Sequence, residues 1–402
     1  MNPSTVTRHS PPVTNYDRWL LLITLLLISF GALMIYSSTS VVTPSLDKKN
    51  ITQFFYFRKH LFTMLIGFVV MFTAYRVSPD TMKKIALPLL MFSFLLLILV
   101  FVPGIGVSSG GARRWLRLWP STFQPSELVK LSMVIFLAKY MSMQNYRTDS
   151  FISFIKPIAV MAVFQVIFLK QPDFGATISL GILTLAMLFL SGMRLRYLLS
   201  LTVFTIPIIV KLIKEPYRWK RVTSFLNPWD DPQGSGFQLT QSFIAFGSGG
   251  LKGVGLGESK QKLLFLPETH TDFIFSLVGE ELGLIGVTVV ISLFLVLFIK
   301  GISITNKAKG SFVYYLSFGL SIMIALQALI NFFVVTGMIP TKGLPLPFIS
   351  YGGSSLLVNM AAIGILLNLS KGEDERKVID RTRDMVVRKK ALRAVYGKQF
   401  KV

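Results

Sequence analysis

The sequence predicts an all-α polytopic membrane protein with about ten transmembrane helices. Of its 402 residues, 52% are hydrophobic and 15% are charged, whereas soluble domains have about 25% charged residues. Apolar runs of about 20 residues, the length that crosses a bilayer, recur along the chain. A water-soluble helical protein would instead show core runs of about 10 to 14 residues. The runs lie at 18–38, 57–76, 84–103, 126–143, 152–170, 174–191, 197–213, 273–300, 311–336 and 349–370.

The basic residues set the predicted orientation, because short loops rich in Lys and Arg stay in the cytoplasm. Such residues fall in alternate loops, at Arg76, Lys83, Lys84, Arg147, Arg194, Arg196, Lys307 and Lys309. The first run has full membrane length and no obvious cleavage site, so we expect it to remain as the first helix. Both termini are therefore predicted to be cytoplasmic. The expected parts are a tail at 1–17, a membrane domain at 18–370 with a large extracytoplasmic loop at 214–272 before the eighth helix, and a basic tail at 371–402.

The net charge of +23 has an explanation at the membrane surface. The basic residues are dispersed over loops on both faces, which argues against nucleic-acid binding. The carboxy-terminal tail can lie on anionic lipid, where each basic residue contributes about 1 kcal/mol. The absence of cysteine excludes disulfides and thiolate chemistry.

Two extracytoplasmic connections break the charge rule. Their basic residues are Arg113, Arg114 and Arg117 within 104–125, and Lys214, Arg218, Lys220 and Arg221 at the start of the long loop. One interpretation is tolerance, because long loops cross the membrane largely regardless of charge. The other is a basic rim that holds an anion such as the phosphate of a lipid. Aromatic residues between 225 and 232 argue against disorder, so we expect the long loop to re-enter the membrane or lie along its interface.

A short polar segment precedes the eighth run. Glu268, His270 and Asp272 stand together just before residues 273–300, which are nearly all apolar. These polar groups lie where water gives way to hydrocarbon, and we expect chemistry there, at the membrane surface. From the residues alone, Asp272 is equally well interpreted as the N-cap of the following helix, a role for which Thr271 competes.

Polar residues also interrupt the apolar runs. They are Glu127, Lys130, Asp173, Glu280, Glu281, Gln327 and Asn331. A charge near the bilayer centre costs about 2.5 to 3.5 kcal/mol, so these groups are expected to face a protein interior or a wet cavity. For the pairs at 127/130 and 280/281, structural pairing and function both stay open. For the other three, helix capping and interhelical hydrogen bonding are favoured over catalysis.

The connection before the last run is rich in Pro, Gly and Ser. Three prolines between 340 and 347 preclude a regular helix there. The Gly-Gly-Ser-Ser cluster at 352–355 fits either close helix approach or a functional turn. Lys342 should lie on the same outward surface as Asp272, where its ammonium can pair with an anion.

Several segments together resemble the SEDS family of bacterial shape, elongation, division and sporulation proteins. They lie at 111–115 with 123–128, 171–175, 221–222 with 227–228, 266–275 and 340–355. They occur in order along nearly the whole membrane domain, and the combination is highly specific although each segment alone is weak. Residues 340–343 are more similar to the division-type (FtsW) branch and its sporulation relatives than to the elongation-type (RodA) branch.

The resemblance implies a processive peptidoglycan glycosyltransferase that polymerises lipid II at the outer face of the cytoplasmic (inner) membrane during septal wall synthesis. The 4-hydroxyl of one lipid-linked disaccharide displaces undecaprenyl diphosphate from the anomeric carbon of another. An α-linked donor that becomes a β-1,4 linkage implies a single inverting displacement with a base at the acceptor. Asp272 matches the family's essential aspartate and is assigned as this base, a role that contributes about 10²- to 10⁴-fold. Desolvation at the lipid boundary can raise the pKa of such a carboxyl above its ordinary value of about 4.

The resemblance also implies the other site residues. The expected substrate-binding residues are Arg113, Arg114, Lys130, Arg221, Glu268, His270, Lys342 and Ser350. The arginines and Lys342 would hold the pyrophosphate, and Lys130 would line the cavity, paired with Glu127. A divalent cation, Mg or Mn, is expected at Glu268 or Asp272, and no organic cofactor is expected.

The family works with a cognate class B penicillin-binding protein and other division proteins. This chain has no S-x-x-K signature of a serine transpeptidase, so cross-linking must come from that partner. Three alternatives stay open: an elongation-type polymerase, a lipid II flippase and a non-enzymatic division scaffold. A flippase would use the charged residues inside the membrane and would tolerate Asp272→Asn.

Overall fold

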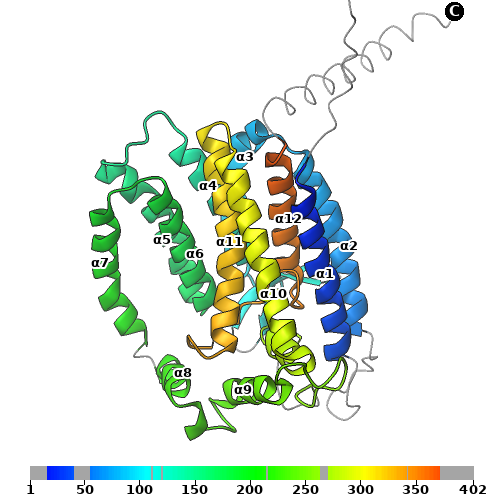
Figure 1. The fold of residues 1–402 in the computed structure, drawn as a ribbon. Helices are drawn as coiled ribbons and strands as arrows, with labels where there is room; N and C mark the ends of the chain where they lie inside the picture. The colour runs from blue at the N-terminus through cyan, green and yellow to red at the C-terminus, as the bar shows by residue number, and fades with distance from the viewer. Residues whose placement is uncertain are drawn as a thin grey trace, which may run out of the picture.

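The computed structural model describes residues 16–39, 55–109, 112–118, 121–213, 216–262, 270–341 and 343–371. Long helices form a bundle, and shorter elements gather toward one end of it (Figure 1). The bundle helices are α1 (Arg18–Thr39), α2 (Phe55–Arg76), α3 (Pro79–Leu99), α4 (Pro125–Met141), α5 (Phe151–Lys170), α6 (Phe174–Leu190), α7 (Leu195–Ile213), α10 (Ile274–Asn306), α11 (Ser311–Val335) and α12 (Gly353–Leu369).

A helix occupies each of the ten predicted apolar runs, although some ends differ. α3 begins before its apolar run because Ser78 caps it, accepting a hydrogen bond from the Thr81 nitrogen at 3.3 Å, and Pro79 takes the first helical position. α12 begins later than predicted, at Gly353. In the described part of the chain, six helices are long and apolar enough to cross a membrane, and α6 and α12 are shorter apolar helices.

The expected long loop at 214–272 is partly folded. It contains α8 (Pro216–Leu226), the 3-10 turn η1 (Pro228–Asp230) and α9 (Phe237–Gly249). In Figure 1, α9 lies across the end of the bundle rather than along it. This arrangement agrees with a segment that lies along the membrane interface.

The all-α prediction was wrong for the connection at 104–125. β1 (Gly106–Ser109), β2 (Ala112–Leu118) and β3 (Ser121–Phe123) form a three-stranded antiparallel sheet in the order β1-β2-β3. In β2, Ala112 and Leu116 are buried while Arg113 and Arg117 are exposed. The pairing of β1 with β2 is irregular at Arg114, which has no partner residue in β1. The arginines at 113, 114 and 117 concealed the strand because they suggested a charged loop.

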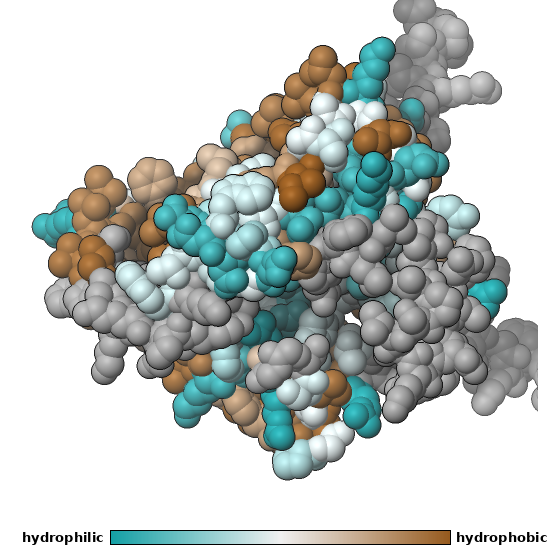
Figure 2. Space-filling model, turned by 90° about the horizontal axis from the view of Figure 1, so that it is seen from below, coloured by the Kyte–Doolittle hydropathy of each residue, from teal (hydrophilic) through white to brown (hydrophobic). Residues whose placement is uncertain are grey.

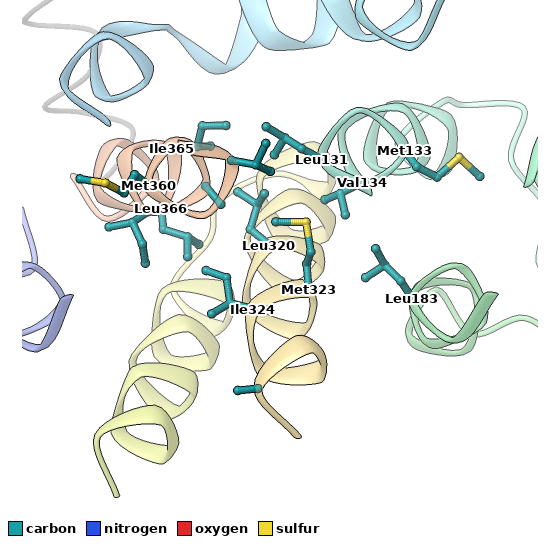
Figure 3. Packing of buried hydrophobic residues seen from close by; sticks show 14 of the residues in the cluster. Leu131, Met133, Val134, Leu183, Leu320, Met323, Ile324, Met360, Ile365 and Leu366 are labelled. Carbon is teal, nitrogen blue, oxygen red and sulfur yellow. The ribbon is translucent and has the colours of Figure 1, made fainter. Parts of the chain in front are cut away.

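The core of the bundle lies where α4, α11 and α12 meet. Figure 3 shows the buried side chains there, which include Leu131, Met133 and Val134 from α4, Leu320, Met323 and Ile324 from α11, and Met360, Ile365 and Leu366 from α12. The outer helices instead expose large apolar side chains, such as Val69 on α2 and Leu95 on α3. Apolar surface on this scale marks a lipid or protein interface.

The two described ends of the chain lie at the same end of the bundle. The Asp17 nitrogen donates a hydrogen bond to the Ser370 hydroxyl at 3.1 Å. The Lys300 ammonium lies 3.7 Å from the Asp17 carboxylate. The opposite end carries α8, α9 and the start of α10 (Figure 1).

Helix α10 is broken at Gly283, where φ is 63° and ψ is −160°. In a continuous helix, the nitrogens of residues 284 and 285 would bond to the carbonyls of residues 280 and 281. Here the loop after α9 takes over both partners. The bonds run from Leu284 N to Gly250 O (2.9 Å), Ile285 N to Leu251 O (3.3 Å), Val254 N to Glu280 O (3.0 Å) and Gly255 N to Glu281 O (3.1 Å). The break therefore leaves none of these four backbone groups unpaired.

We predict that Gly283→Ala destabilises the protein. Its new Cβ would lie 2.7 Å from the carbonyl of Leu251 and against the nitrogen of Gly253, and overpacking of this kind costs about 1 to 3 kcal/mol. The positive φ adds strain of similar size for any residue other than Gly. Thermal unfolding in detergent measures the effect.

Gly247→Ala is the matched control, because nothing lies within 4 Å of a Cβ built at Gly247 in α9. This variant should melt at or slightly above the wild-type temperature. Equal melting temperatures for Gly283→Ala and wild type would contradict the tight approach of loop and helix.

Candidate active site

Asp272 lies immediately before α10 and is half-buried. The N-cap residue of α10 is Phe273, whose side chain makes no capping hydrogen bond, so Asp272 is not the N-cap residue of this helix. The Asn331 amide on α11 donates to the Asp272 carbonyl and to the Leu344 carbonyl, each at 2.8 Å. Asn331 thus joins the Asp272 backbone to the connection before α12. This is the structural hydrogen bonding that the sequence analysis favoured for Asn331 over a catalytic role.

The carboxylate of Asp272 lies beside the backbone of Gly343. A Cβ built at Gly343 would lie 2.8 Å from the Asp272 Oδ2 atom. Lys342, the residue before Gly343, lies outside the described residues. The chain that carries Lys342 nevertheless reaches the Asp272 carboxylate, in agreement with a shared outward surface.

Aromatic rings surround His270, which is half-buried. The Tyr351 nitrogen donates to the His270 carbonyl at 2.8 Å. The ring centroids of Tyr56 and Tyr351 lie 5.1 Å and 5.7 Å from that of His270. Burial, with the Tyr56 phenol adding to it, raises the pKa of Tyr351 to about 12, so its hydroxyl stays neutral at physiological pH.

Sequence reasoning missed Tyr56 and its neighbour His60, which lie at the start of α2. His60 is 2% exposed, and its ring centroid lies 6.2 Å from that of Tyr351. Its Nε2 atom has no hydrogen-bond partner among the residues that the structure describes. Tyr351 lies inside a segment that the sequence did single out, whereas contact with α2 is visible only in three dimensions.

Ser350 is buried and holds a tight turn. Its hydroxyl accepts a hydrogen bond from the Leu346 nitrogen at 2.8 Å, and its own nitrogen donates to the Leu346 carbonyl at 3.0 Å. Within this turn Phe348 has φ 65°, a conformation that costs about 1 to 3 kcal/mol for a residue other than Gly. The structure gives Ser350 a local structural partner, and its substrate contact stays a prediction.

Arg113 and Arg114 lie next to each other in β2 but differ in exposure. Arg113 is exposed and Arg114 is half-buried. Arg114 donates from Nε to the Gln171 carbonyl at 3.2 Å and from Nη2 to the Pro172 carbonyl. It therefore fastens the sheet to the turn between α5 and α6, while Arg113 is the arginine of the pair that is presented to solvent.

The same turn is tied to the start of α12. Asp173 caps α6, accepting from the Ala176 nitrogen at 3.1 Å, as expected. Its other oxygen accepts from the Gln124 amide at 3.0 Å. The Gln124 nitrogen donates to the Ser354 hydroxyl at 2.7 Å, so the sheet, the α5–α6 turn and the start of α12 form one connected frame.

Glu127 and Lys130 form a buried ion pair in α4. Their charged atoms are 2.8 Å apart, and each residue is 3% exposed. Glu127 Oε2 and the Ser126 hydroxyl have no hydrogen-bond partner within the described chain. The predicted pairing is confirmed, and the pair lies inside the bundle.

The remaining predicted residues are Arg221, Glu268 and Lys342. Glu268 and Lys342 lie outside the described residues, and of Arg221 only its place in α8 is described. The described residues contain no group of three His, Cys, Asp or Glu side chains that could hold a metal ion. Figure 2 views the molecule from the end that carries α8 and α9, and it shows hydrophilic residues around a recess in the middle of that face.

Comparison with known proteins extends the resemblance to almost the whole chain. Residues 18–375 match the FtsW/RodA/SpoVE family, described as cell cycle proteins. A probable peptidoglycan glycosyltransferase FtsW of Geobacter sulfurreducens is 43% identical over 360 residues, covering 89% of this chain and 96% of that protein. Stage V sporulation protein E of Bacillus subtilis is 42% identical over 361 residues, covering 89% and 98%.

Solved structures agree. A structure described as showing coordination of polymerization and crosslinking by a peptidoglycan synthase complex is 26% identical, with a TM-score of 0.73, and covers 90% of this chain and 99% of its own. The crystal structure of the rod shape determining protein RodA of Thermus thermophilus is 25% identical, with a TM-score of 0.65, and covers 90% and 98%. The family match covers residues 18–375, and the relative from Geobacter sulfurreducens is 43% identical over 360 residues. The chain therefore belongs to the FtsW/RodA/SpoVE family of cell cycle proteins, the SEDS family that its motifs resemble.

Proposed function

We propose that this chain is a peptidoglycan glycosyltransferase that polymerises lipid II at the outer face of the cytoplasmic membrane during cell division. The observation that carries the proposal is the half-buried Asp272, whose backbone carbonyl is bonded to Asn331 of α11 and whose carboxylate lies beside the backbone of Gly343. Relatives that are 43% identical over most of the chain carry the name peptidoglycan glycosyltransferase FtsW. The membrane helices supply the boundary at which a lipid-linked sugar presents its head group.

Asp272 acts as the general base in this proposal. It accepts the proton of the acceptor 4-hydroxyl as that oxygen bonds to the anomeric carbon of the donor. The bond between the anomeric carbon and the phosphate oxygen breaks, and its electrons leave with undecaprenyl diphosphate. The configuration at the anomeric carbon inverts in this single step.

Basic residues hold the pyrophosphate of the donor. The solvent-facing Arg113 offers a planar fork that suits phosphate oxygens. Lys342 precedes the glycine that touches Asp272, and we propose that its ammonium meets the same pyrophosphate. Arg221 on α8 completes the set. Arg114 contributes the guanidinium N–H groups that do not bond to the α5–α6 turn.

A divalent cation, Mg or Mn, fits this arrangement. Mg²⁺ commonly binds through one or two carboxylates together with substrate phosphates and keeps several waters, so a site without three clustered protein ligands is adequate. We propose Glu268 or Asp272 as the protein ligand. The cation would neutralise charge on the pyrophosphate.

We also propose ten membrane spans with both termini in the cytoplasm and with boundaries at 17/18 and 370/371. The contacts of Asp17 with Ser370 and Lys300 support this topology, because an even number of spans returns the chain to its starting side. The basic loops with Arg147 and Arg194 are expected at the same end. A class B penicillin-binding protein at the septum is the proposed partner, and the likeness to a synthase complex supports it.

Lipid II flipping is the second candidate, and the buried Glu127–Lys130 pair favours it. Charged groups inside a membrane bundle commonly mark transport pathways. A flippase would move the lipid across the bilayer without joining sugars. Its activity would depend on this pair and not on Asp272.

Asp272→Asn tests the proposal. The amide keeps the shape of the side chain but cannot accept the proton, so polymerisation should fall about 10²- to 10⁴-fold. Glycan strands made from lipid II by the reconstituted protein, with its transpeptidase partner, report the rate on a gel. Asp230→Asn, an exposed carboxylate in the same extracytoplasmic segment, should keep wild-type activity. Wild-type strands from Asp272→Asn would overturn the assignment.

The cation has a separate test. We expect Mn²⁺, followed by electron paramagnetic resonance, to bind the protein in the presence of undecaprenyl diphosphate. Glu268→Gln and Asp272→Asn should together weaken this binding, because they remove both proposed carboxylate ligands and leave only the diphosphate. Undiminished binding to the double variant would refute the ligand assignment.

Lys130→Met separates structural from substrate roles of the buried pair. Leaving Glu127 unpaired should cost about 3 to 5 kcal/mol of stability, and Lys130→Met with Glu127→Gln should recover most of it. Unfolding in detergent and polymerisation are measured on both variants. If the double variant is stable but inactive, Lys130 contacts substrate, and if its activity also returns, the pair is structural only.

A further inference from the structure

Two buried carboxylates hold the chain that leads from α9 to Asp272. Glu280 and Glu281, on the first turns of α10, are 1% and 0% exposed. Glu280 accepts hydrogen bonds from the Ser259 hydroxyl, the Lys260 nitrogen (3.0 Å) and the Gln261 nitrogen (3.4 Å). Glu281 accepts from the Ser37 hydroxyl of α1 at 2.6 Å and 2.8 Å, and its carboxylate lies 3.6 Å from the Lys262 ammonium.

These contacts act on a part of the loop that the break in α10 does not hold. The backbone bonds around Gly283 fasten residues 250–255. Residues 257–262, the second half of the loop, belong to no helix or strand. The carboxylates of Glu280 and Glu281 bind this half. It runs directly into the segment 263–272, which ends at the proposed base.

The number of donors explains why the position is a carboxylate rather than an amide. Three groups donate to the two oxygens of Glu280, all from consecutive residues 259–261. A glutamine has one acceptor oxygen, and its NH₂ group would face at least one of these donors. Burying an ionised carboxylate is expensive, yet the helix itself needs no such group because its broken backbone is already paired by residues 250–255.

The residues at both ends of the segment 263–272 are therefore attached to the same two turns of α10. Lys262 is bound by Glu281, and Phe273 is the N-cap of the helix that carries Glu281. Ser37 fixes the same carboxylate to α1. Anchoring on rigid elements is what holds a catalytic group within a fraction of an ångström of productive geometry.

We propose that Glu280 and Glu281 are positioning residues for the glycosyl transfer: by clamping residues 259–262 they set the place of the Asp272 carboxylate. This inference rests on the proposed role of Asp272 as the base. Neither glutamate touches the reacting atoms. Loosening the clamp slows the chemical step.

The test is Glu280→Gln in the full-length protein, reconstituted with its transpeptidase partner and supplied with lipid II. The kcat should fall about 10- to 100-fold, the usual effect of removing a group that orients a catalytic residue. The KM should change less than kcat, because the residues proposed to hold the pyrophosphate, Arg113, Arg221 and Lys342, lie outside 257–272. Hydrogen–deuterium exchange should rise in peptides that cover 257–272.

Glu258→Gln is the matched control, because Glu258 is an exposed carboxylate in the same loop; it should leave kcat, KM and exchange at wild-type values. Ser259→Ala is the gentler second variant should Glu280→Gln not fold. It removes one donor to Glu280 and should produce the same split between kcat and KM, with a smaller loss.

Five outcomes decide the matter. Faster exchange at 257–272 with wild-type kcat overturns the inference, and so does a loss of kcat with unchanged exchange. Unchanged kcat together with unchanged exchange overturns it as well. An active Asp272→Asn in the same assay overturns the proposed function instead, whereas an inactive Asp272→Asn beside a fully active Glu280→Gln removes only the positioning role.

Discussion

The break in α10 at Gly283 is the constraint on which the end of the bundle that carries α8 and α9 depends. A helix interrupted inside a membrane protein must find new partners for its backbone, because no water is there to supply them. The loop 250–255 provides all four hydrogen bonds, and Gly253 allows its backbone to come close enough. This exchange brings residues 257–262 to the first turns of α10. The clamp at Glu280 and Glu281, and with it the approach to Asp272, follows from that one interruption.

Polar groups in the rest of the bundle obey the same requirement. On α11, the Gln327 amide donates to the Pro345 carbonyl at 3.1 Å and to the Ser355 hydroxyl at 2.7 Å. One turn away, Asn331 binds the backbone of Asp272 and Leu344. These side chains form a seam that fastens the proline-rich connection to α11. Hydrogen bonds between helices therefore position the site that the apolar contacts of the core cannot orient.

The sequence predicted what depends on local composition and missed what depends on contacts between distant segments. Ten apolar runs located ten helices because membrane length and hydropathy are properties of single segments. The clusters around Asp272 and Lys342 were also local, and Gly343 proved to touch Asp272. The partnership of Tyr56 with Tyr351 joins α2 to the start of α12, and no pattern in either segment announces it. The break at Gly283 was equally hidden, since a glycine in an apolar run is ordinary until another loop bonds to it.

Asn331 holds the segment of Asp272 and the segment of Leu344 together. This contact bears on how the proposed glycosyl transfer can proceed in a single displacement at a lipid surface. A base must stay within hydrogen-bond reach of the acceptor while the leaving group departs on the other side of the anomeric carbon. In the proposed site the base is the Asp272 carboxylate, and one of the phosphate-binding groups is the Lys342 ammonium. A single Asn331 amide binds the backbone of Asp272 itself and that of Leu344, two residues after Lys342. That amide therefore joins the two segments that carry the proposed base and the proposed phosphate-binding lysine, so both segments are referred to the same turn of α11.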